Sequence, residues 1–164
     1  MIMSTQFNVE EILEIACQVE RNGAAFYRKA AELVSLEDSK KQLLELAKME
    51  VGHENTFHSM RGSAQLNDEQ SDPEGMAAQY LRAIASNHVF VSTNDPTEKF
   101  HANTSAKDVL GIALQAEFAS IAFFQGLLDF MPEIFGPGKL REIIAEEQEH
   151  VVIISRKLAI LAAR

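Results

Sequence analysis

A Glu-x-x-His motif occurs at residues 50–53 and again at residues 147–150. A spacing of three residues places both side chains on one face of a helix, one turn apart, so each motif can offer a carboxylate oxygen and an imidazole nitrogen to one metal ion. A further glutamate precedes each motif by the same interval, since 50 − 20 and 147 − 117 both equal 30. The repeated set of candidate metal ligands is Glu20, Glu50, His53, Glu117, Glu147 and His150.

Helical periodicity accounts for the elements that must position these residues. Apolar residues recur at helical spacing and predict four long helices, at about 9–34, 36–60, 106–131 and 139–163. A shift of 97 residues lays the third helix on the first and the fourth on the second, and it aligns the two motifs. This internal repeat predicts two helical hairpins of common design. Residues 62–105 form the long connection, so the expected fold is an all-α four-helix bundle with one crossover, in a single domain over residues 1–164.

Local signals predict where these helices begin and end. Ser105 and Asp108 have the spacing of a capping box that opens the third helix, and Pro132 ends it. Gly62-Ser63 is expected to end the second helix, and Gly136-Pro137-Gly138 to separate the third from the fourth. Within the long connection, residues 74–87 could form a short helix.

All four glutamates of the set occupy positions on the apolar stripes of their helices. A buried and unpaired carboxylate costs several kcal/mol, so the bundle must neutralise them. Lysines and arginines do not share these stripes near the same levels, and two divalent cations would balance four carboxylates. Mixed oxygen and nitrogen ligands suit iron or manganese, with zinc possible. The competing interpretation, surface helices whose acids coincide by chance, does not explain the equal intervals.

Composition restricts the class of protein. The 164 residues carry 15 Lys and Arg against 24 Asp and Glu, a net charge of -9, and no basic stripe that would bind nucleic acid. Purely apolar stretches such as 151–154 are far shorter than the ~20 residues of a membrane span. Residues 1–6 lack the features of a signal peptide, so a cytoplasmic location is expected. Cys17 is the only cysteine, which excludes an internal disulfide and a four-cysteine metal site.

The chain resembles the ferritin-like di-iron carboxylate superfamily, in its rubrerythrin branch. The residues that carry the resemblance are Glu20 with Gly23, Phe26-Tyr27 and Ala30-Ala31; residues 49–54; Gln115-Ala116-Glu117; and residues 146–150. The resemblance implies two iron ions bridged by Glu50 and Glu147. It also implies terminal ligands Glu20 and Glu117, with His53 and His150 on separate metals. Members of this family react with peroxide or dioxygen.

Two departures from classical rubrerythrins affect the expected activity. Those proteins carry a C-terminal rubredoxin-type domain with four cysteines, whereas this chain ends at Arg164, so electrons would come from a separate donor protein. They also carry a second glutamate one turn after the ligand in the third helix, where this chain has Ser120. Three functions therefore stay open: reduction of peroxide or dioxygen, iron storage with ferroxidase activity but no peroxidase turnover, and a structural bundle with a redox-silent metal.

Residues near the candidate ligands have less specific roles. Tyr27 is expected to pack in the core and hydrogen-bond a ligand carboxylate. Glu54, Glu146 and Glu149 are expected on a solvated acidic face. Aromatic residues surround the third helix on nearly all sides, which favours a homodimer interface; they are Phe118, Phe123, Phe124, Phe130 and Phe135.

Overall fold

The computed structural model describes residues 9–64, 76–87, 90, 96–100, 104–130 and 137–163. Over these residues it contains helices and no strand. The elements are α1 (Val9–Leu33), α2 (Glu37–Ala64), α3 (Met76–Asn87), a short 3-10 helix η1 (Pro96–Lys99), α4 (Ala106–Phe130) and α5 (Pro137–Ala162).

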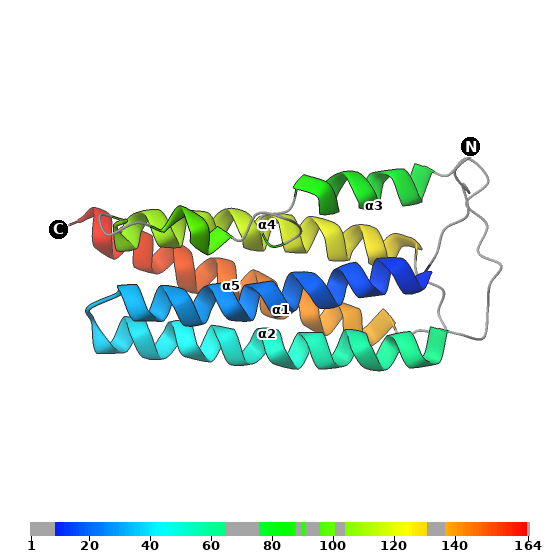
Figure 1. Cartoon of the computed structure of the whole chain (residues 1–164), viewed down its shortest axis with the longest axis horizontal. Coiled ribbons are helices and arrows are strands. Elements are labelled where there is room, and N and C mark those ends of the chain that lie inside the picture. Colours follow the sequence, from blue (N-terminus) through cyan, green and yellow to red (C-terminus); the bar gives the residue numbers. More distant parts are fainter. Residues whose placement is uncertain are drawn as a thin grey trace.

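Four of the helices form the predicted bundle (Figure 1). α1 packs chiefly against α2 and α4 chiefly against α5, so each hairpin is built from helices adjacent in sequence. The direction of the chain reverses between α1 and α2 and again between α4 and α5, and α2 runs antiparallel to α5 (Figure 1). The shorter α3 packs along α4 on the outside of the bundle. The prediction of an all-α four-helix bundle built from two hairpins is therefore confirmed.

The capping box at the start of α4 is also confirmed. The backbone N–H of Asp108 donates to Ser105 Oγ at 3.1 Å, and the backbone N–H of Ser105 donates to Asp108 Oδ2 at 3.1 Å. These two bonds satisfy donors that a helix start would leave unpaired. The predicted stop at Pro132 lies outside the described residues.

Two predicted boundaries are wrong. α2 continues through Gly62-Ser63 to Ala64. One interior glycine costs only about 1 kcal/mol, and Arg61 ties this turn to α1 through ion pairs with Glu14 and Glu10. α5 already begins at Pro137, because proline is well suited to the first position of a helix, where its missing N–H costs nothing.

The aromatic side chains of α4 are buried largely within one chain. Phe123 and Phe124 are fully buried, and Phe124 lies 4.9 Å, centroid to centroid, from Phe57 of α2. α3 covers another side of α4: a Cβ added to Gly126 would come within 2.7 Å of the Tyr80 ring, so the glycine allows this close approach. Phe118 remains 49% exposed. The homodimer interface favoured by these aromatic residues stays a prediction; the side chain of Phe130 and all of Phe135 lie outside the described residues.

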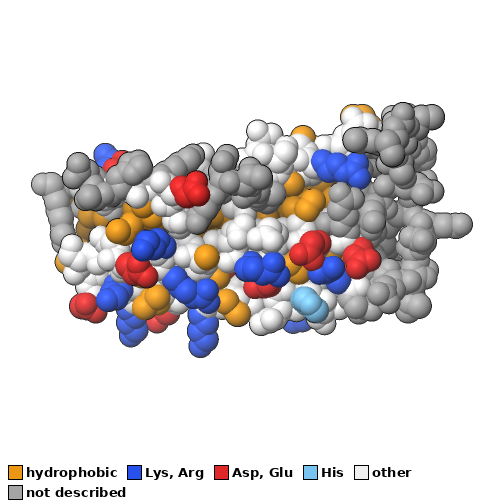
Figure 2. Space-filling model, viewed as in Figure 1, with side chains coloured by type: hydrophobic (Ala, Val, Ile, Leu, Met, Phe, Trp, Pro, Cys, Tyr) orange, Lys and Arg blue, Asp and Glu red, His pale blue; other side chains and the backbone are white. Residues whose placement is uncertain are grey.

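One described helix, α4 between Ala106 and Asp129, is long and apolar enough to cross a membrane by length and composition. This is weak evidence, because the core helix of a bundle passes the same test, and half of this segment is buried in the molecule. The segment also carries Glu117, which is buried in the bundle core. On the face shown in Figure 2, Lys and Arg side chains are interspersed with Asp and Glu over α1 and α2.

Candidate metal centre

All six predicted ligands meet in the middle of the bundle, contributed by α1, α2, α4 and α5. Their ligand atoms form two clusters, and within each cluster these atoms lie within 4.8 Å of one another. Every member is buried, with at most 3% of its surface exposed. Glu50 and Glu147 belong to both clusters, so each can offer one oxygen to either side. The first cluster is Glu20, Glu50, His53 and Glu147; the second is Glu50, Glu117, Glu147 and His150.

Each histidine directs Nδ1 into its own cluster. His53 Nδ1 lies 2.9 Å from Glu147 Oε1 and 3.4 Å from Glu20 Oε2. His150 Nδ1 lies 3.2 Å from the other oxygen of Glu147 and 3.5 Å from Glu117 Oε1. The two rings stack with centroids 5.9 Å apart and planes 21° from parallel. The two imidazoles therefore lie side by side, one for each cluster.

Several polar atoms of this centre lack, among the described residues, the hydrogen-bond partners that buried groups require. Both carboxylate oxygens of Glu20 and Glu147, and Nδ1 of both histidines, are buried and have no hydrogen-bond partner in the part of the chain that the structure describes. A buried polar atom left without a partner costs about 1–3 kcal/mol, and more when it is charged. Oxygen and imidazole donors that converge in two groups fit a pair of divalent cations, which would satisfy them together.

Electrostatics within the cluster favour protons on the terminal carboxylates when no cation is bound. Burial, together with the charges of Glu50 and Glu147, raises the pKa of Glu20 well above its ordinary value. Burial and the charge of Glu147 raise the pKa of Glu117 to about 8. A metal that binds here must therefore displace protons, so its affinity depends on pH.

The shared carboxylates and the histidines shift in the complementary direction. Burial alone would raise the pKa of Glu50, but the adjacent carboxyl group of Glu20 and the imidazoles of His150 and His53 lower it below its ordinary value. Burial alone would lower the pKa of His150, but its carboxylate neighbours raise it to about 12. The pKa of His53 is raised for the same reason, by Glu147, Glu20 and Glu50. In the metal-free centre, protonated histidines thus balance part of the carboxylate charge.

Tyr27 contacts the centre as the sequence predicts. Its hydroxyl donates a hydrogen bond to Glu117 Oε1, across the bundle from α1 to α4. Burial and the nearby carboxylates raise the pKa of the Tyr27 hydroxyl well above its ordinary value, so it remains a donor. The shift of 97 residues relates Tyr27 to Phe124. Phe124 has no hydroxyl that could donate an equivalent hydrogen bond to Glu20.

Glu146 is a residue of the site that sequence reasoning placed on a solvated acidic face. Its Oε2 lies 2.6 Å from His53 Nε2, so the imidazole N–H donates outward while Nδ1 faces the cluster. A carboxylate in this place fixes the tautomer and orientation of a metal-binding histidine. The pairing depends on how α2 and α5 are rotated against each other, which periodicity alone does not specify.

The second histidine lacks this support. The shift of 97 residues relates Glu146 to Met49 and His150 to His53. The repeat therefore gives His150 a methionine at the position that corresponds to Glu146 beside His53. Correspondingly, His150 Nε2 is buried, and none of the described residues offers it a hydrogen-bond partner. The two halves of the centre therefore differ in two respects: Glu146 supports His53 in one cluster, and Tyr27 supports Glu117 in the other.

The crossover connection covers one side of the centre through Phe90. A Cβ added to Gly23 would lie 3.3 Å from the Phe90 ring and 3.4 Å from Glu50 Cδ, so glycine allows both groups to approach α1. Asn22 donates a side-chain hydrogen bond to the carbonyl of Phe90 and holds it there. Phe90 also packs against Phe26, with centroids 5.2 Å apart.

On the opposite side, a cavity of about 280 Å³ opens between α2 and α5. His53 and Glu146 line it, together with Lys139 and Glu142. This opening connects the Glu146 side of His53 with the surface.

Other candidate residues lie away from the centre. Glu54 pairs with Arg21, whose Nε donates to it at 2.8 Å, and Glu149 is exposed. Cys17 is buried, and burial raises the pKa of its thiol, which fits a packing role. Ser120 lies one turn after Glu117 in α4 and is buried, with 3% of its surface exposed.

This bundle and its paired clusters define a ferritin-like helical protein with a buried Glu/His centre that fits dinuclear metal binding. Residues 11–150 match the family model of rubrerythrin, and the chain belongs to the rubrerythrin family. A crystal structure from Thermotoga maritima, provisionally described as a ferritin-like diiron-carboxylate protein, is similar, with a TM-score of 0.75 and 26% sequence identity. The similarity covers 94% of this chain and 96% of that one. A comparison with curated proteins found no match.

Proposed function

We propose that the centre binds two iron ions and that the chain is an oxidoreductase acting on peroxide or dioxygen. The observation that carries the proposal is the convergence of unpartnered ligand atoms into two clusters that share Glu50 and Glu147. Iron in a carboxylate and imidazole environment supplies electrons for two-electron reduction of an oxidant. The family and the similar Thermotoga maritima protein support iron over manganese or zinc.

The residues of the chain have distinct roles in this proposal. Glu50 and Glu147 lie between the two positions, and Glu20 and Glu117 would each hold one outer side. Tyr27 keeps the Glu117 carboxylate in place, and Glu146 does the same for His53. Phe90 and the aromatic residues around it exclude water on the crossover side.

The test is elemental analysis followed by anaerobic loading with Fe(II) and titration with peroxide or dioxygen. We expect about two metal ions per chain and an optical change upon oxidant addition. Glu50→Ala should lower the metal content, whereas Glu45→Ala, at an exposed position in the same helix, should not. Full metal content in Glu50→Ala would contradict the ligand assignment, and a loaded protein inert to both oxidants would contradict the oxidoreductase assignment.

We also propose that the chain forms a homodimer and receives electrons from a separate donor protein. Phe118, an aromatic side chain of α4 that is 49% exposed, supports the first point. The absence of a second cysteine from the sequence supports the second, because a rubredoxin-type site needs four. Light scattering measures the assembly: a dimer agrees with this proposal, whereas a shell of many subunits would favour iron storage.

A further inference from the structure

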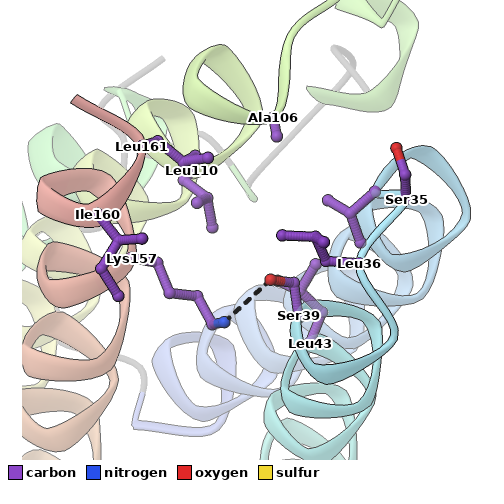
Figure 3. Close-up of a pocket in the computed structure, with 10 residues that line it drawn as sticks. Ser35, Leu36, Ser39, Leu43, Ala106, Leu110, Lys157, Ile160 and Leu161 are labelled. Atoms are coloured by element: carbon purple, nitrogen blue, oxygen red, sulfur yellow. Dashed lines mark hydrogen bonds between the residues drawn. The ribbon is translucent and has the colours of Figure 1, made fainter. Parts of the chain in front are cut away.

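A second cavity, of about 360 Å³, lies where the two hairpins meet at one end of the bundle. It is lined by the turn between α1 and α2, the first turns of α4 and the last turns of α5 (Figure 3). The buried side chains of Leu43 and Leu110 form part of its wall. Leu36 and Ile160, which are 49% and 57% exposed, also line it. A cavity of this size with mainly apolar walls is in the range that binds small organic ligands.

One cation and two hydroxyl groups interrupt these apolar walls. Lys157 extends from α5 toward α2, and its Nζ donates to Ser39 Oγ at 3.2 Å (Figure 3). Ser35 lines the cavity at the same turn. No carboxylate of the described residues forms an ion pair with Lys157, although Asp38 acts on it at longer range. Partial burial lowers the pKa of Lys157, which means that its ammonium group would gain from an anionic partner.

We propose that this cavity binds an amphiphilic carboxylate, with the carboxylate at Lys157 and Ser39 and the alkyl chain against Leu43 and Leu110. The match is one of charge and polarity. The single cation selects one anionic group, the hydroxyl of Ser39 offers it a further donor, and the leucines bury the chain. Charge-assisted hydrogen bonds of this kind are about twice as strong as neutral ones.

This site is distinct from the metal centre. Leu43 and Leu110 each precede a candidate ligand, Glu50 and Glu117, by seven residues, or two helical turns, which is ~10 Å along the axis. The ligand would therefore bind whether or not metal is present.

The experiment is calorimetric titration of the whole protein with decanoate, using 1-decanol and decyltrimethylammonium as probes of equal chain length. We expect saturable binding of one decanoate per chain and weaker binding of both other probes. Lys157→Gln should weaken decanoate binding about tenfold and leave 1-decanol unchanged. Lys139→Gln, which removes an exposed lysine at the far end of α5, should have no effect.

Several results would overturn the proposal. One is the absence of saturable decanoate binding to the wild-type protein, and another is equal binding of the three probes. A third is occupation of the cavity by a second copy of this chain. In that case Ile160→Asp would dissociate the assembly, and decanoate would not compete with the second copy for the cavity. The comparison of probes on the wild-type protein keeps the test decisive if Lys157→Gln does not fold.

Discussion

The inequivalence of the two clusters leads to a prediction about stepwise metal binding. Glu146 Oε2 lies 2.6 Å from His53 Nε2, whereas His150 Nε2 has no hydrogen-bond partner within the described ranges of the chain. Loss of a carboxylate behind a metal-binding histidine weakens metal binding by about 10–100-fold. Because the Glu146 side chain is 48% exposed, we expect the lower end, about tenfold or ~1.4 kcal/mol, for Glu146→Ala.

Anaerobic titration with Fe(II) against a chromophoric chelator would resolve the two equivalents. The wild-type protein should bind them with different affinities. Glu146→Ala should weaken one equivalent and leave the other, and Glu146→Gln should have a smaller effect because its amide oxygen can still accept from His53 Nε2.

Glu149→Gln is the matched control, since it removes the same charge from an exposed position one turn along α5. If Glu149→Gln and Glu146→Gln weaken binding equally, the effect is one of net charge and not of the hydrogen bond to His53. If Glu146→Ala weakens both equivalents alike, or neither, the reasoning from the asymmetry of the centre is refuted.

Three further predictions concern the same centre. Tyr27→Phe removes the hydroxyl that holds Glu117 and should lower the free energy of unfolding by about 1 kcal/mol in chemical denaturation, whereas Tyr80→Phe, at a half-exposed position, should change little. Gly23→Ala should weaken metal binding, because its Cβ would crowd Glu50 and Phe90. Gly52→Ala, whose Cβ would meet nothing within 4 Å, should instead stabilise the fold by up to about 1 kcal/mol. Equal behaviour of the two variants would contradict this prediction. The metal-free protein should lose stability as the pH rises from about 6.5 to 8. In this range Glu117 (pKa about 8) and His150 (pKa about 12) keep protons in the folded state that the unfolded chain releases. Each such proton should lower the free energy of unfolding by about 1.4 kcal/mol per pH unit. Thermal melts with a chelator present measure this, and a stability that is flat or rises over that range would show that the protons are not held; bound metal should remove the slope.

The sequence alone was sufficient for the fold and for the set of candidate ligands. Helical periodicity is a local property, and the repeat of 97 residues brings Glu20, Glu50, Glu117 and Glu147 into register without knowledge of any contact. Carboxylates on apolar stripes are costly, so their placement already indicates a charged partner inside the bundle.

Only the tertiary structure decided how the two halves of the centre differ. The contact of Glu146 with His53 depends on the rotation of α5 against α2, and the bond from Tyr27 to Glu117 depends on the distance between α1 and α4. The cover provided by Phe90 and the cavity at Lys157 likewise join segments far apart in the chain. Periodicity specifies which face of a helix is buried, but the partner of each side chain on that face is set by the packing of the helices against one another.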